Sequence, residues 1–137
     1  MRAGDEFDYE QATAGDAMRQ EVIYCPPEAP LRTVAQIMAR DRIHCVVVGT
    51  EQGWGVVTDH DLLRAAESGI DGVCAGDVMA ADLPTVGVDQ SLDRARKLMV
   101  EHEVSHALVV DARSGRPVGV LSSLDVAGLL AIGRSSS

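Results

Sequence analysis

The chain has 137 residues, of which 46% are hydrophobic and only 3% aromatic, so its core must be built from aliphatic side chains. The net charge is −9 and no Lys/Arg run could follow a phosphate backbone, which argues against nucleic acid as a partner. No apolar stretch approaches the ~20 residues of a membrane span, and the N-terminus is too acidic for a signal peptide. The three cysteines lack a CxxC pair and indicate buried thiols of a cytoplasmic protein rather than metal ligands.

The elements expected along the chain occur in the same order twice. Residues 1–12 are expected to be a flexible acidic tail, and residues 134–137 a loose C-terminal tail. The first repeat spans residues 13–70 and the second spans residues 71–133. Each predicts an extended piece, an amphipathic helix, two strands joined by a turn, and a closing helix. In the first repeat these elements are 21–26, 30–41, 44–49, 55–57 and 59–69. In the second they are 82–88, 91–103, 106–111, 117–121 and 123–133.

The internal repeat is visible as shared phrases. Shifting the sequence by 61 places "AGDAM" at residues 14–18 on "AGDVM" at residues 75–79. After a turn the shift becomes 64, and "GVVTDHD" at residues 55–61 falls on "GVLSSLD" at residues 119–125. Two copies are too few for a solenoid. The sequence therefore predicts an α/β (α+β) fold with two β-α-β-β-α repeats that cover each other's apolar faces.

The repeated hydroxyl and aspartate have two interpretations. Thr58 with Asp61, and Ser122 with Asp125, each precede an apolar helical run, which is the pattern of a helix N-terminal capping box. The same position offers free N–H groups and a positive potential that suit a phosphate. A carboxylate beside it could accept vicinal sugar hydroxyls. Because the pattern recurs after the same strand in both repeats, a nucleoside-phosphate site competes with simple capping.

The duplicated unit, with "GVVTDHDLL" and "GVLSSLDVA" and the openings "AGDAM" and "AGDVM", resembles the cystathionine β-synthase (CBS) domain in tandem, also called a Bateman module. The resemblance covers residues 13–133. It implies two repeats packed about a pseudo-two-fold axis, with clefts that bind adenosyl ligands such as AMP, ADP, ATP or S-adenosylmethionine. It also implies that the aspartate binds the ribose hydroxyls and that the Ser or Thr helps to hold the phosphate.

Carried over by position, the resemblance implies two crossed ligand sites. One would use Ile23, Tyr24, His44, Val46, Ser122 and Asp125. The other would use Thr85, Val86, Ser105, His106, Ala107, Thr58 and Asp61. Arg64 follows Asp61 by three residues and could reach a phosphate, whereas its counterpart is Gly128. The sequence therefore predicts unequal sites, with the stronger one at Asp61 and no comparable cation beside Asp125.

The function expected from this reading is regulatory. The chain would bind an adenine nucleotide, require no cofactor or metal, form a homodimer through its apolar helices, and act on an unidentified protein partner. The alternative is a constitutive dimerisation or docking module without a physiological nucleotide. An enzyme is not expected, because the sequence has no nucleophile–base motif, GxxxxGK loop or metal-ligand spacing.

Overall fold

The structure is a computed structural model that describes residues 8–20 and 22–132. The tail residues 1–7 and 134–137, and the predicted helix end at Gly133, lie outside the described residues. The chain forms two compact units. Unit 2 is the continuous segment from Ile23 to Asp82, whereas unit 1 combines the residues before Ile23 with those from Leu83 on.

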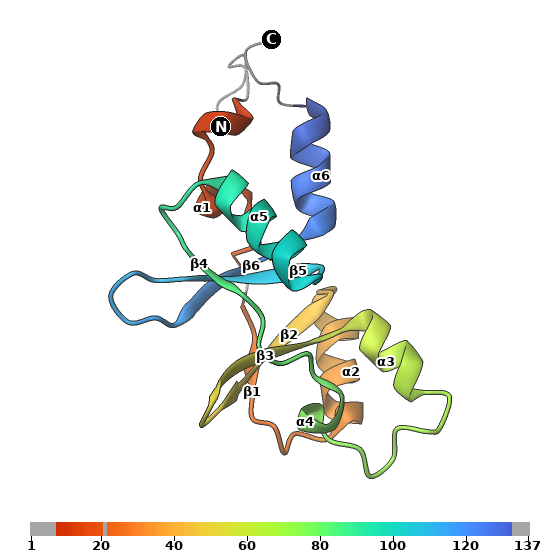
Figure 1. Ribbon diagram of the computed structural model, residues 1–137. Coiled ribbons are helices and arrows are strands. Elements are labelled where there is room, and N and C mark those ends of the chain that lie inside the picture. Colours follow the sequence, from red (N-terminus) through yellow and green to blue (C-terminus); the bar gives the residue numbers. More distant parts are fainter. Residues whose placement is uncertain (1–7, 21, 133–137) are drawn as a thin grey trace. The chain divides into compact units, whose positions relative to one another are not determined.

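Unit 2 contains a three-stranded mixed sheet in the order β1-β2-β3 (Figure 1). Strand β1 is parallel to β2, and β2 is antiparallel to β3. The elements are β1 (Tyr24–Cys25), α2 (Leu31–Asp41), β2 (Cys45–Thr50), β3 (Gly53–Thr58), α3 (Asp59–Ala65) and α4 (Ala75–Val78). Helix α2 buries the side chains that recur at helical spacing, Leu31, Val34 and Met38, against this sheet. Helix α3 ends at Ala65, four residues before the predicted end.

Unit 1 repeats this sheet as β4-β5-β6, again with one parallel and one antiparallel pairing. Its elements are η1 (Tyr9–Gln11), α1 (Ala14–Ala17), β4 (Thr85–Gly87), α5 (Leu92–His102), β5 (His106–Val110), β6 (Pro117–Ser122) and α6 (Ser123–Ile132). Leu92, Ala95 and Met99 form the buried face of α5. The predicted β-α-β-β-α order is therefore confirmed in both repeats.

The middle residues of the two central strands, β2 and β5, are buried, as their unbroken aliphatic runs predict. Successive residues of a strand point to opposite faces. Val46, Val47 and Val48 in β2 are at most 1% exposed, and Ala107, Leu108 and Val109 in β5 are fully buried.

Part of the segment expected to be a loose tail is packed. Residues 9–11 form the short helix η1, in which Tyr9 is buried in the core of unit 1. The Tyr9 hydroxyl lies 3.5 Å from Asp93 Oδ1 on α5. Burial, reinforced by the Asp93 charge, raises the pKa of the Tyr9 phenol. An aromatic ring in an otherwise acidic stretch supplies the apolar area that holds it in place.

Two short segments that the sequence did not predict to be helical lie across the sheets. We call residues 13–20 the first strap and residues 74–81 the second strap. They contain the "AGDAM" and "AGDVM" phrases and form α1 and α4. Each strap belongs to the unit built from the other sequence repeat, since the first strap lies in unit 1 and the second in unit 2.

The straps make matching backbone hydrogen bonds in the two units. Arg19 N–H donates to the Val120 carbonyl on β6 at 2.9 Å, and Val120 N–H donates back to Arg19 at 3.2 Å. The second strap repeats this exchange between Ala80 and Val56 on β3 at 2.8 and 3.0 Å. The straps therefore end beside the strand that leads into each hydroxyl–aspartate pair.

The glycine of each repeated phrase is explained by this crossing. A Cβ at Gly119 would lie 2.4 Å from Met18 Sδ and 2.9 Å from the Arg19 carbonyl oxygen. At Gly55 it would lie 2.7 Å from the Ala80 carbonyl oxygen. Only glycine lets the strap approach the strand this closely.

Candidate functional site

The first hydroxyl–aspartate pair forms the junction between β3 and α3. Asp61 Oδ2 accepts hydrogen bonds from Thr58 N–H at 2.8 Å and from Thr58 Oγ1 at 3.0 Å. Thr58 Oγ1 in turn accepts from Asp61 N–H at 3.3 Å. This is a complete capping box, and Thr58 is the buried polar residue of the unit. The threonine hydroxyl is therefore used fully by the protein.

The second pair forms the junction between β6 and α6 with a looser geometry. Asp125 Oδ2 accepts from Ser122 N–H at 3.3 Å, and Ser122 Oγ accepts from Asp125 N–H at 3.1 Å. Among the described residues, the Ser122 hydroxyl has no hydrogen bond to the carboxylate like that of Thr58. The capping interpretation is thus correct for both pairs, but it uses one carboxylate oxygen and leaves Oδ1 outside the cap.

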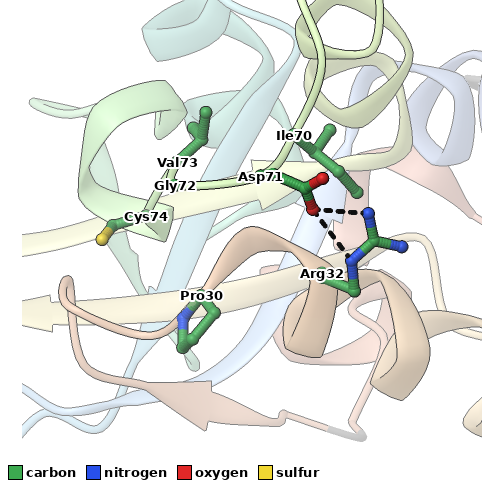
Figure 2. Close-up of a pocket in the computed structure, with 7 residues that line it drawn as sticks. All are labelled: Pro30, Arg32, Ile70, Asp71, Gly72, Val73 and Cys74. Carbon is green, nitrogen blue, oxygen red and sulfur yellow. Dashed lines mark hydrogen bonds and ion pairs between the residues drawn. The ribbon is translucent and has the colours of Figure 1, made fainter.

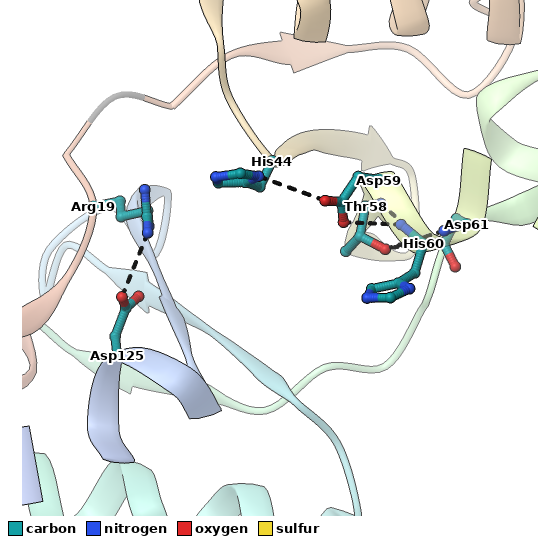
Figure 3. A network of polar contacts seen from close by, with 7 residues as sticks. All are labelled: Arg19, His44, Thr58, Asp59, His60, Asp61 and Asp125. Atoms are coloured by element: carbon teal, nitrogen blue, oxygen red, sulfur yellow. Dashed lines mark hydrogen bonds and ion pairs between the residues drawn. The ribbon is translucent and has the colours of Figure 1, made fainter. Parts of the chain in front are cut away.

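Each outer oxygen faces an arginine, and Figure 3 shows the arginine beside Asp125. Asp61 Oδ1 lies 3.8 Å from Arg64 Nη1 on the same helix. Asp125 Oδ1 lies 3.6 Å from Arg19 Nη2, which comes from the first strap. The prediction that no cation accompanies Asp125 is therefore wrong. Arg19 precedes Asp125 by more than a hundred residues, and its repeat counterpart is Ala80, so no sequence spacing indicated this contact.

The two pairs also differ in neighbouring carboxylates. Asp59 follows Thr58, and its Oδ2 lies 3.5 Å from Nδ1 of His44, which is an exposed side chain (Figure 3). The equivalent of Asp59 in unit 1 is Ser123. The Asp61 pair therefore has an additional negative charge beside it, whereas the Asp125 pair has none at that position.

Among the residues assigned by resemblance, His44 and His106 lie next to the hydroxyl–aspartate pair of their own unit, and the crossed grouping stays a prediction. In unit 2, Cys45 is the register partner of Thr58, and Asp59 N–H donates to the His44 carbonyl. In unit 1, His106 is the register partner of Ser122. The side chains of Val46, Val86 and Ala107 are buried, so these positions can offer a ligand only backbone groups. Ile23 is partly buried, and Tyr24, Thr85 and Ser105 are exposed.

Tyr24 also belongs to an aromatic pair. Its ring centroid lies 5.9 Å from that of Trp54, with the planes tilted by 58°. Trp54 lies across from Gly49 on the neighbouring strand, and a Cβ at Gly49 would come within 2.9 Å of the indole. Trp54 therefore packs on its own sheet, and as the single tryptophan it reports on unit 2.

A surface pocket of about 350 Å³ lies elsewhere in unit 2 (Figure 2). It is lined by Pro30, Arg32, Ile70, Asp71, Gly72, Val73 and Cys74. None of the predicted site residues lines it. Its charged groups pair with each other, since Arg32 Nη2 lies 2.6 Å from Asp71 Oδ1. The pocket therefore offers no unpaired charge to a ligand.

No group of three or more His, Cys, Asp or Glu side chains is placed to hold a metal ion within residues 8–20 and 22–132. In the same residues, no helix is both long and apolar enough to cross a membrane.

Comparison with protein-family models matches the CBS domain twice, over residues 14–68 and 75–132. Among curated proteins, the chain is 31% identical over 123 residues to the homoserine O-acetyltransferase of Methanohalophilus mahii. That alignment covers 88% of this chain but 25% of the enzyme, so the chain spans about a quarter of that relative's length. The chain is 29% identical over 116 residues to the CBS domain-containing protein YhcV of Bacillus subtilis, covering 82% of this chain and 81% of YhcV.

Solved structures share the fold at low identity. The CBS domain pair of protein MJ0100, in complex with 5′-methylthioadenosine and S-adenosyl-L-methionine, has a TM-score of 0.71 at 22% identity, covering 86% of this chain and 98% of that one. CBSX2 in complex with AMP has a TM-score of 0.63 at 26% identity, covering 85% and 94%. A hexameric CBS-CP12 protein from bloom-forming cyanobacteria has a TM-score of 0.72 at 20% identity, covering 84% and 69%.

Proposed function

Since the chain belongs to the CBS domain family and contains the domain twice, we propose that it is a regulatory module that binds an adenosyl ligand such as AMP, ADP, ATP or S-adenosylmethionine. Binding would change the conformation available to a protein partner through differential affinity rather than through chemistry. The acetyltransferase activity of the M. mahii relative is not carried over, because the match covers only a quarter of that enzyme.

The observation that carries this proposal is that the two carboxylate oxygens of each aspartate have different contacts. Oδ2 of Asp61 and of Asp125 caps the following helix, and Oδ1 lies outside the cap beside a guanidinium. A cap fixes the carboxylate, and a fixed carboxylate with an outer oxygen is suited to accept sugar hydroxyls. The complexes of MJ0100 with adenosyl compounds and of CBSX2 with AMP support the choice of ligand class.

The test is isothermal calorimetry with AMP and S-adenosylmethionine on Asp61→Asn and Asp125→Asn. If the carboxylates bind ribose, the affinity at the altered site should fall about ten- to hundredfold, the value of one charge-assisted hydrogen bond. Asp16→Asn is the matched control, since Asp16 closes an equivalent capping box with Thr13, in the first strap. All three variants should lose similar stability, about 1 kcal/mol or less. Unchanged affinities in folded Asp61→Asn and Asp125→Asn would leave these residues as caps only.

The surface of α6 favours self-association, which the alternative function, a constitutive dimerisation or docking module without a physiological nucleotide, requires. Leu124 and Ile132 are 79% and 71% exposed, and Leu130 is also exposed. Exposed aliphatic side chains gathered on one helix are typical of a covered interface. We propose that a second copy covers them, which makes the chain a homodimer. Light scattering should give twice 14.5 kDa, and Leu124→Glu/Ile132→Glu should give the monomer mass. A wild-type monomer at micromolar concentration would contradict the homodimer.

A further inference from the structure

We infer that Arg19 is the residue through which unit 1 recognises the anionic part of its ligand. This inference rests on the proposed function, because it assigns a specificity role at the Asp125 site. It concerns the first strap, which comes from the opposite sequence repeat to the strand and helix that form that site.

The backbone of Arg19 is held firmly beside the site. Its N–H and C=O both bond to Val120, two residues before Ser122 on β6. Met18 packs directly over Gly119, so the strap cannot slide along the strand without a clash. Because this backbone is fixed, the Arg19 side chain can extend from it in only a few directions. In this structure its guanidinium lies toward Asp125, with Nη2 3.6 Å from Oδ1 (Figure 3).

The guanidinium has capacity left for a ligand. It carries five N–H donors, and a single contact at 3.6 Å to Asp125 uses little of that capacity. The side chain is 58% exposed, whereas Asp125 is 21% exposed. The cation is therefore the more accessible member of the pair, and its planar fork matches the oxygen atoms of a phosphate or carboxylate.

The positive charge of Arg19 can offset the repulsion between an anionic ligand and Asp125. In a protein of net charge −9, an anionic ligand whose ribose binds Asp125 must bring its own charge close to a carboxylate. Arg19 offsets that repulsion at the point of contact. In unit 2 the strap residue at the same place is Ala80, and the cation there is Arg64, which extends from α3 itself and is 77% exposed. The pair in unit 2 also includes Asp59. The two units consequently differ in their tolerance for anions.

The experiment compares two ligands that share adenosine but differ in charge, AMP and 5′-methylthioadenosine. Their affinities are measured by calorimetry on the wild type, Arg19→Ala and Arg19→Lys, and the unit 1 event is identified by its loss in Asp125→Asn. Arg19→Ala reproduces the residue that the second strap carries, so the strap backbone already accepts alanine at this position in the other unit. Thermal unfolding verifies the fold of each variant.

Arg19→Ala should weaken AMP binding at the unit 1 site at least tenfold and leave 5′-methylthioadenosine binding within twofold of the wild type. Arg19→Lys should restore part of the AMP affinity, because it returns the charge without the fork. An equal loss for both ligands would mean that Arg19 only positions Asp125. Tighter binding of both would mean that Arg19 obstructs the carboxylate, and no change would place Arg19 outside the site. Each of these results overturns the inference while leaving the adenosyl site intact. If the wild type bound neither ligand, the proposed function would fail first, and the inference with it.

Discussion

Replacing Gly119 by alanine tests the packing of the first strap on β6. The added Cβ would lie 2.4 Å from Met18 Sδ, 2.8 Å from Met18 Cγ and 2.9 Å from the Arg19 carbonyl oxygen. The methionine side chain can move, but the carbonyl is fixed by its hydrogen bond from Val120 N–H at 3.2 Å. The strap must therefore lift from the strand, and overpacking of this kind costs about 1–3 kcal/mol. Alanine also reduces the conformational entropy of the unfolded chain, which stabilises the folded state by roughly 0.4–1 kcal/mol.

We therefore expect Gly119→Ala to lower the free energy of unfolding by about 1–2 kcal/mol, measured by urea denaturation followed by circular dichroism. Gly128→Ala is the matched control, because Gly128 lies within α6 with nothing within 4 Å of the added methyl group. That change should stabilise the protein by roughly 0.5–1 kcal/mol.

A double-mutant cycle with Met18→Ala locates the clash. Removing the Met18 side chain opens space for the methyl group but leaves the Arg19 carbonyl in place. The penalty of Gly119→Ala should therefore be smaller in the Met18→Ala background by about 0.5 kcal/mol or more. If Gly119→Ala were as stable as Gly128→Ala, the close approach of the strap would not be the reason for this glycine.

Two further predictions concern ionisable groups. The hydrogen bond from Arg96 Nε at 2.6 Å lowers the pKa of Asp93, so this carboxylate contributes stability above its unfolded pKa of about 3.9 and loses it as pH falls through the lower folded value. Because Asp93 is partly exposed, Asp93→Asn should lower the free energy of unfolding in urea by only about 0.5 kcal/mol at pH 7. The difference between the variant and the wild type should shrink below pH 4. A difference that persists at pH 2 would contradict the ion pair as its cause. Burial raises the pKa of the Cys25 thiol, so a maleimide at pH 8 should label the half-buried Cys45 and Cys74 before Cys25. Peptide mass spectrometry follows the labelling of each cysteine. Equal labelling rates for all three cysteines would contradict the burial of Cys25.

The order of elements could be predicted from sequence because it depends on local patterns. The helical spacing of Leu31, Val34 and Met38 and the unbroken valines of β2 each specify one element and its burial. The capping boxes at Thr58 and Ser122 could also be predicted, since a cap involves residues three apart.

Contacts between distant segments could not be predicted. The "AGDAM" phrase was visible as a repeat, but nothing in it indicates that Met18 packs on Gly119 or that Arg19 reaches Asp125. Residues 9–11 are predicted as part of an acidic tail that precedes the first repeat, although one buried ring is enough to hold them. Arg64 could be predicted beside Asp61 because the two are close in sequence, whereas Arg19 is distant from Asp125 in sequence and was not predicted there. The stronger binding expected at Asp61 stays a prediction.

The crossing of the straps has a consequence for how the chain acquires its structure. Unit 2 is one uninterrupted segment of the chain, whereas unit 1 needs the residues before Ile23 to meet those after Asp82. Contacts of such long sequence separation form slowly, because a long loop must close before they bring any gain. During synthesis from the N-terminus, unit 2 can be completed once residue 82 has emerged, while the first strap waits for β6. We therefore expect unit 2 to fold first and the first strap to dock in a later and slower phase. A break in the chain between Val22 and Ile23 should slow the folding of unit 1 and leave the folding of unit 2 unchanged.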